Sequence, residues 1–191
     1  MDNKIYFSSS RLEAFYDAII AIIVTVLVLS LPQPSEASLS ALGALKGNYF
    51  AYLISFLICT NLWQYHHLIY NHVEKIDMVI IWQNIALLFV VSLIPYLTIF
   101  VAENQFSLLA QVLYGLDFIL INMIHFFMAR TLIRINPEDK NLLNALNIRN
   151  GMIIPLILFV VGLVIAFLGY PVAISFCCLI TIVRSIVYSL K

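Results

Sequence analysis

Charged residues are scarce in this chain of 191 residues, because only 10% are Asp, Glu, Lys or Arg while 63% are hydrophobic. Soluble domains average about 25% charged and roughly 45–50% apolar residues, so a soluble globule of this size could not bury so much apolar surface. Disordered chains have the opposite bias. The formal net charge of +0 argues against a nucleic-acid-binding protein, and we expect no nucleic-acid partner.

Cysteine and the common catalytic motifs are also rare or missing. The three cysteines all lie in apolar stretches, which excludes a secreted disulfide scaffold. The sequence contains no His-Glu-x-x-His, no Cys-x-x-Cys, no Gly-rich phosphate loop and no Gly-x-Ser-x-Gly. We therefore expect no cofactor, no structural metal and no enzymatic activity.

The remaining class is an integral membrane protein made of helices. A bilayer span needs about 20 mostly apolar residues, and six such stretches predict one all-α domain over residues 1–191. The predicted spans are residues 11–31, 48–72, 76–101, 106–133, 152–168 and 172–190. A polar stretch over 33–47 follows the first span and another over 134–151 follows the fourth, while Pro95 predicts a kink in the third.

Basic residues predict the orientation of these spans, because cytoplasmic loops carry the excess of Lys and Arg. With the N-terminus inside, only Lys46 falls on the outer side. The basic residues on the inner side are then Lys4, Arg11, Lys75, Arg130, Arg134, Lys140, Arg149, Arg184 and Lys191. We therefore expect both termini in the cytoplasm and no cleavable signal peptide.

The first predicted span carries its charges at one end, with none beyond Asp17. Positions three and four residues apart share a helix face, and Asp17 lies off the stripe that this rule defines. The stripe comprises Arg11, Phe15, Ala18, Ile22, Thr25 and Leu29. By composition alone it fits a lipid-embedded helix with snorkelling charges as well as a functional surface.

Three short motifs in the first half of the chain narrow these alternatives. They are Arg11-x-x-x-Phe15-Tyr16-Asp17, Trp63-Gln-Tyr-His66-His67, and Trp82-Gln83-Asn84 followed by Leu93-Ile94-Pro95. Together they resemble the signatures of the transmembrane protein 175 family, the endosomal and lysosomal potassium channels with bacterial members of one six-helix unit. The chain departs from that family at Tyr16, where the signature Arg-x-x-x-Phe-Ser-Asp has a serine.

The resemblance implies a homotetramer in a prokaryotic inner membrane, in which the first helices line a central pore for potassium and other monovalent cations. It implies apolar constrictions at Ile22 and Leu29, and a polar layer at Thr25 where potassium passes. Apolar rings gate by dewetting, and the chain has no Thr-Val-Gly-Tyr-Gly filter. The positioning motif of the pore helix is Arg11, Phe15 and Asp17.

Polar residues in the second and third predicted spans predict a hydrogen-bond network between helices. Its expected members are His66, His67, Trp82 and Asn84, joined to Asp17. We interpret this network as structural, holding the pore helix in register, in preference to direct ion contact.

Asp117 and His125 in the fourth predicted span leave a second functional class open. A small proton-coupled secondary transporter would use them as its titrating pair. Such carriers often have broken helices at matched positions, and Pro95 and Pro155 are not so arranged. We therefore favour the channel, with a non-conducting membrane scaffold and a membrane enzyme as weaker alternatives.

Overall fold

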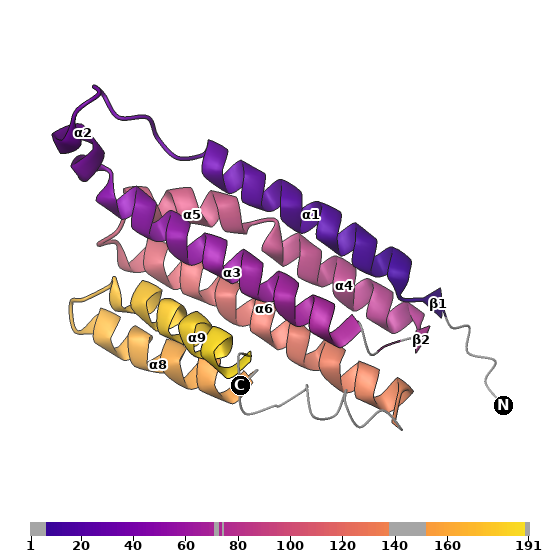
Figure 1. Ribbon diagram of the computed structural model, residues 1–191. Coiled ribbons are helices and arrows are strands. Elements are labelled where there is room, and N and C mark those ends of the chain that lie inside the picture. The colour runs from indigo at the N-terminus through magenta and orange to yellow at the C-terminus, as the bar shows by residue number, and fades with distance from the viewer. Residues whose placement is uncertain (1–6, 71–72, 74, 138–151, 190–191) are drawn as a thin grey trace.

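A computed structural model describes residues 7–70, 73, 75–137 and 152–189, and its long helices run side by side (Figure 1). These helices are α1 (Ser10–Leu29), α3 (Lys46–Tyr70), α4 (Met78–Val91), α5 (Ile94–Glu103), α6 (Leu108–Ile135), α8 (Ile154–Phe167) and α9 (Ala173–Ser189). They cover the six apolar stretches of the sequence. The first polar stretch contains the short helix α2 (Leu39–Ala44), whose N-cap Ser38 accepts a hydrogen bond from the backbone N–H of Ala41.

Three segments are long and apolar enough to cross a membrane, namely Ser10–Leu29, Met78–Glu103 and Leu108–Ile135. Two others, α8 and α9, are shorter apolar helices of 14 and 17 residues. Helix α3 has 25 residues and carries Asn, Gln and His side chains among its apolar ones.

Parts of the predicted spans, polar stretches and orientation lie outside the described residues. These are residues 71–72 at the end of the second predicted span, residues 138–151 of the second polar stretch, residue 190 at the end of the sixth span, and the basic residues Lys4, Lys140, Arg149 and Lys191.

The third apolar stretch is interrupted, and the interruption precedes its proline. Helix α4 ends at Val91 and α5 begins at Ile94, with Ser92 and Leu93 between them. The Ser92 hydroxyl donates to the carbonyl oxygen of Phe89 at 2.7 Å, which helps to close α4. Pro95 then lies in the first turn of α5, where its missing N–H removes no helical hydrogen bond. The predicted kink is therefore a break between two helices.

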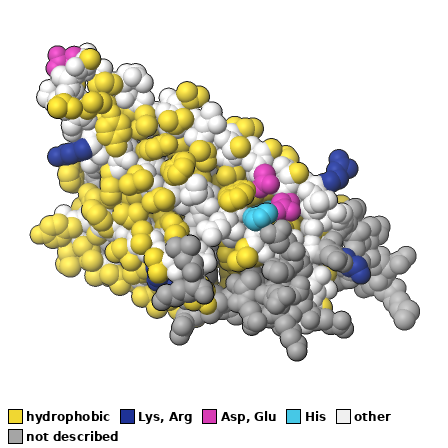
Figure 2. Space-filling model, in the orientation of Figure 1, with side chains coloured by type: hydrophobic (Ala, Val, Ile, Leu, Met, Phe, Trp, Pro, Cys, Tyr) yellow, Lys and Arg dark blue, Asp and Glu magenta, His cyan; other side chains and the backbone are white. Residues whose placement is uncertain are grey.

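Helix α1 packs against α3, α4 and α5, and it lies at the edge of the bundle (Figure 1). On the other side, α6 packs against α4, α5 and the hairpin formed by α8 and α9. That hairpin turns at Gly169, whose φ of 103° is a conformation that glycine adopts without a steric penalty. Hydrophobic side chains cover most of the visible surface of the helices (Figure 2), as a surface in contact with acyl chains requires.

A two-stranded antiparallel pairing joins the segment before α1 to the segment before α4. Strand β1 (Phe7–Ser8) pairs with β2 (Lys75–Ile76), with Phe7 opposite Ile76 and Ser8 opposite Lys75. Ser9 adds a hydrogen bond from its hydroxyl to the carbonyl oxygen of Val73 at 2.6 Å. The first turns of α1 and α4 are thereby tied together at one end of the bundle.

Candidate functional site

Helix α1 has one face that packs on the rest of the chain and one that does not. The packed face holds the buried residues Tyr16, Ile20, Ile23 and Leu27. Every member of the stripe predicted from the sequence lies on the uncovered part of the helix, where Phe15 is 51%, Ile22 61% and Leu29 77% exposed. A helix of 20 residues thus presents a continuous, mainly apolar surface that no described part of its own chain covers.

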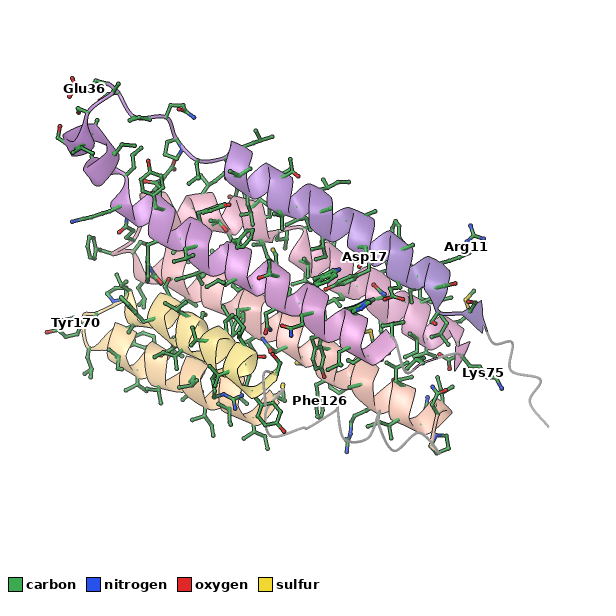
Figure 3. The ribbon with its side chains drawn as sticks, in the orientation of Figure 1. Arg11, Asp17, Glu36, Lys75, Phe126 and Tyr170 are labelled. Atoms are coloured by element: carbon green, nitrogen blue, oxygen red, sulfur yellow. The ribbon has the colours of Figure 1, made fainter. Side chains whose placement is uncertain are left out.

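The polar members of this stripe are Arg11 at its first position and Thr25 one position before its last. The hydroxyl of Thr25 is exposed and donates to the carbonyl oxygen of Ala21 at 2.8 Å. That donation leaves the lone pairs of the oxygen directed away from the helix backbone, available to a cation or to water. Arg11 projects away from the helices (Figure 3).

Two hydrogen-bonded pairs link the first half of α1 to the second half of α3. The indole N–H of Trp63 donates to Asp17 Oδ1 at 3.0 Å. One turn of α1 earlier, Glu13 Oε1 lies 2.9 Å from His67 Nδ1. The Trp63 and His67 rings stack, with centroids 5.4 Å apart and planes within 6°. Asp17 therefore contacts α3 and does not face the exposed stripe.

The His66 ring connects three helices beneath this layer. It stacks on Tyr16 of α1, with centroids 3.7 Å apart and planes within 2°, and on Tyr70 of α3, at 4.2 Å and 15°. Asn84 of α4 donates from Nδ2 to His66 Nε2 at 3.3 Å. Tyr16, His66 and Asn84 are all 0% exposed, so this layer is dry and fixed in the core.

The structure therefore brings together most of the predicted network, along with partners that the sequence analysis did not assign to it. His66 bonds to Asn84, and His67 bonds to Glu13. Trp82 is 66% exposed, and no hydrogen bond to it occurs within the described part of the chain. Trp63, which was not among the expected members, supplies the indole N–H that reaches Asp17.

Asp117 and His125 do not form a pair. Both are buried on α6, at 7% and 5% exposure, but eight positions separate them, which is about 12 Å along a helix axis. His125 Nδ1 lies 3.1 Å from the carbonyl oxygen of Ile121 in its own helix. Among the described residues, no group of three or more His, Cys, Asp or Glu side chains is arranged to hold a metal ion.

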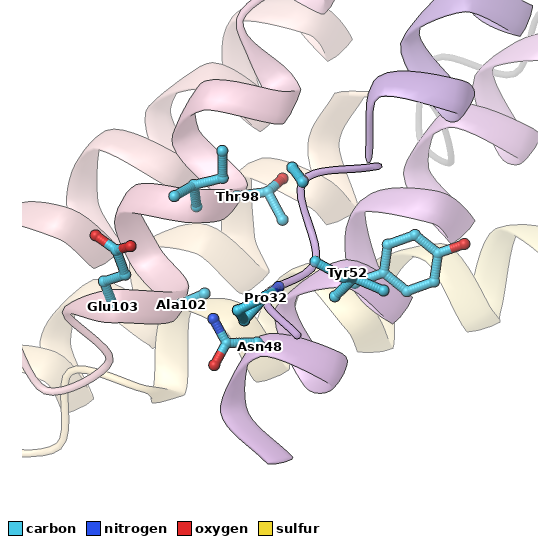
Figure 4. Close-up of a pocket in the computed structure, with 9 residues that line it drawn as sticks. Pro32, Asn48, Tyr52, Thr98, Ala102 and Glu103 are labelled. Atoms are coloured by element: carbon cyan, nitrogen blue, oxygen red, sulfur yellow. The ribbon is translucent and has the colours of Figure 1, made fainter. Parts of the chain in front are cut away.

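A second buried polar cluster and a small cavity lie toward the opposite end of the bundle. The Ser55 hydroxyl lies 2.6 Å from Thr98 Oγ1 and 2.8 Å from the Tyr114 hydroxyl, which joins α3, α5 and α6. Thr98 also faces a cavity of about 60 Å³ beside Glu103 (Figure 4). This volume is far below the ~300–1,000 Å³ typical of ligand pockets. The cavity accommodates water rather than an organic ligand.

Comparison with known proteins gives consistent matches. Residues 11–95 match the family described as endosomal/lysosomal potassium channel TMEM175. The chain is 30% identical over 176 residues to a potassium channel of Chryseobacterium sp. (strain P1-3), and the match covers 92% of each chain. It is 33% identical over 94 residues to the endosomal/lysosomal proton channel TMEM175 of Danio rerio, covering 47% of this chain and 18% of that protein.

A solved structure has a similar fold over nearly the whole chain. The crystal structure of a lysosomal potassium-selective channel TMEM175 homolog from Chamaesiphon minutus superimposes with a TM-score of 0.78 at 25% identity. The superposition covers 93% of this chain and 97% of that chain. The overall helical arrangement described above is therefore shared with that structure.

Proposed function

We propose that this chain, which belongs to the TMEM175 family, conducts potassium passively across a membrane through a central pore lined by α1. The family is one of ion channels and not of enzymes. The family and the helical membrane fold predicted from the sequence motifs are thereby confirmed. Potassium as the permeant ion rests on the bacterial relatives named above.

The observation that carries this proposal is the uncovered stripe of α1. A helix with Ile22 and Leu29 this exposed needs a further surface against it. Other helices also expose apolar side chains, and α1 is the helix proposed to line the pore because it carries the family signature at Arg11, Phe15 and Asp17. Copies of α1 around a common axis enclose a pore, so the proposed assembly is a homotetramer with rotational symmetry. Small residues on the stripe, Ala18 among them, allow close approach of neighbouring helices.

Within that pore, Ile22 and Leu29 form apolar rings and Thr25 forms a hydroxyl layer between them. An apolar ring of small radius excludes water and therefore ions, while a modest widening readmits both. Thr25 oxygens replace part of the hydration shell of a potassium ion passing transiently at that level. Other monovalent cations share this path, since no rigid carbonyl cage selects among them.

The polar contacts of α1 position the pore helix. Asp17 is held by Trp63, and the buried face is fixed by the layer of His66 and Asn84. In the proposed assembly, Arg11 and Phe15 lie on the uncovered side and contact a neighbouring subunit or the inner pore mouth. His67 completes the set of positioning residues through Glu13, whereas Trp82, which is exposed, is not part of it.

The proposed location is the inner membrane of a prokaryote, in keeping with the bacterial source of a relative that matches over 92% of each chain. The proposal includes six spans in one domain, with the lipid bilayer as the surrounding partner and both termini in the cytoplasm. The excess of basic residues on one side of the predicted spans supports that orientation.

The deciding experiment measures the reversal potential of the purified protein in a planar bilayer with potassium on one side and sodium on the other. We expect single-channel steps and a reversal potential displaced toward the potassium equilibrium potential. Steps with no displacement would remove the potassium preference from the proposal. Flux that saturates and requires a proton gradient would replace the channel by a carrier.

A further inference from the structure

We infer that Tyr16 is a positioning residue of the pore helix, which acts through the face of its ring against His66 and not through its hydroxyl. This inference deepens the proposed function and rests on it, because it concerns the rotation of α1 about its axis. It concerns the position at which this chain departs from the serine of the family signature.

The contact between Tyr16 and His66 is a close parallel stack. Their centroids are 3.7 Å apart and their planes differ by 2°, which is face-to-face van der Waals contact over the width of a ring. Tyr70 lies on the other side of His66 at 4.2 Å and 15°. His66 is thus enclosed between two aromatic rings, one from α1 and one from its own helix.

His66 is itself fixed, so it provides a rigid surface for α1. Asn84 donates to its Nε2 from α4, and the ring is 0% exposed. Tyr16 is the one aromatic residue on the packed face of α1, where the other buried residues are Ile20, Ile23 and Leu27. Aliphatic side chains fill space without defining a plane, whereas a ring stacked on a fixed ring resists rotation of the helix that carries it.

The hydroxyl group of Tyr16 takes no part in this contact. Its oxygen is buried and has no hydrogen-bond partner in the described part of the chain, and neither has His66 Nδ1. A buried hydroxyl usually has a hydrogen-bond partner. Tyr16 has none among the described residues, and in this it differs from Asp17 and Glu13, which hold α1 by polar contacts. The contact of Tyr16 with His66 is therefore made by its ring and not by its hydroxyl.

Rotation of α1 at this point changes the pore lining. Ile22 lies six positions after Tyr16 on the same helix, about 120° around its axis. Without the ring, α1 can rotate or move toward α3. Either movement turns the side chains of Ile22 and Thr25 away from the proposed pore axis. Tyr16, on the packed face of α1, therefore sets the orientation of Ile22 and Thr25 on the exposed face.

The test compares three Tyr16 variants in the full-length protein by potassium/sodium reversal potential and single-channel conductance, with thermal stability in detergent measured alongside. Tyr16→Phe should preserve both electrical quantities. Tyr16→Leu should lower the potassium preference and change conductance. Tyr16→Met keeps more of the side-chain volume but has no ring. If Tyr16→Leu fails to assemble, Tyr16→Met should show the lower potassium preference and changed conductance expected of Tyr16→Leu. Leu27→Ala is the matched control for a cavity on the same face, and it should leave the reversal potential unchanged.

A second comparison tests the route through His66. In a His66→Leu background, adding Tyr16→Leu should produce little further change in the reversal potential, because the surface that Tyr16 stacks on is already gone.

Two results would overturn the inference. A shift in Tyr16→Phe as large as that in Tyr16→Leu would show that the hydroxyl acts. An unchanged reversal potential and conductance in Tyr16→Leu, with only a lower melting temperature, would show that the ring merely fills the core. Wild-type protein without potassium current would instead refute the channel itself, so the two failures are distinguishable.

Discussion

The two faces of α1 are almost equally apolar, yet they differ in what surrounds them. The packed face, with Tyr16, Ile20, Ile23 and Leu27, is between 0% and 5% exposed. On the opposite face, Ile22 and Leu29 are 61% and 77% exposed. In a soluble protein such a difference would be an anomaly; in a membrane protein it indicates a surface for lipid, for a neighbouring subunit or for a pore.

This difference shows that the hydrophobicity of a segment predicts a membrane helix but does not predict which face of that helix packs against the rest of the chain. Isoleucine and leucine occur on both faces, so these amino-acid types do not distinguish the packed face from the exposed one. The distinguishing features are polar residues at particular positions, since Asp17 and Glu13 lie toward α3 while Thr25 lies on the exposed side. Four comparisons test this distinction, beginning with the largest expected effect.

The largest effect should come from a polar residue on the exposed face. We expect Ile22→Asn to raise the leak current and weaken the potassium preference, because an amide ring hydrates an apolar constriction. Bilayer recordings with potassium and sodium on opposite sides measure both. Ile22→Val, which keeps the apolar surface, serves as the control and should remain close to wild type. Unchanged conductance and selectivity in Ile22→Asn would move the constriction elsewhere.

A pair of leucines on the same helix gives the next comparison. Leu27 is 0% and Leu29 77% exposed, so the same truncation removes core contacts in one case and surface contacts in the other. Leu27→Ala should cost about 2–5 kcal/mol in the free energy of unfolding. Leu29→Ala should cost far less and should alter single-channel conductance instead. Thermal unfolding in detergent and bilayer recording together separate the two effects, and equal loss of stability in both variants would contradict the assignment of faces.

A smaller loss should follow removal of the bond that joins α1 to α3. Trp63→Phe keeps an aromatic ring but deletes the indole N–H that donates to Asp17 at 3.0 Å. We expect a cost of about 1–2 kcal/mol, since a hydrogen bond to a carboxylate is lost at a partly exposed site. Trp82→Phe is the matched control, because Trp82 is 66% exposed. A loss of thermal stability as large in Trp82→Phe as in Trp63→Phe would show that the Asp17 bond is not the cause.

The smallest effect should come from the exposed pair of Glu13 and His67. Their side chains are 22% and 47% exposed, and a hydrogen bond at such a site contributes only about 0.5–1.5 kcal/mol. Glu13→Gln, which weakens the acceptor without removing it, should therefore lower thermal stability slightly. Glu36→Gln, a change of the same kind in the segment before α2, provides the baseline. A loss above that of Trp63→Phe would reveal a larger role for Glu13.

Much of the fold follows from the sequence because the apolar stretches have the length of a bilayer span. The stripe through Ile22 and Thr25 was defined by helical spacing alone, and the structure leaves all of it uncovered. Of the polar residues expected to join the helices, His66 lies beside Asn84 and His67 beside Glu13, whereas Trp82 is exposed. These features depend on periodicity and residue type, which a sequence displays directly.

Other features depend on which helices become neighbours, and periodicity carries no information about that. The stack of Tyr16 on His66 and the bond from His67 to Glu13 require α1 and α3 to pack at one particular depth. The exposure of Trp82 follows from the same packing, because α4 presents another face to the bundle. The strand pairing of Phe7–Ser8 joins segments too short to show any alternation.

The pairing of β1 with β2 also fixes the relative depth of two helices. It brings the starts of α1 and α4 together at Ser10 and Met78, which are 68 positions apart, so residues with that separation lie at about the same level. The far end of the bundle agrees, because Ser30 and Thr98 line the same cavity. On this scale the break at Ser92 and Leu93 is level with Val24 and Thr25. The third apolar stretch is therefore interrupted beside the second half of α1, at the level that contains Thr25, and not beside either end of that helix.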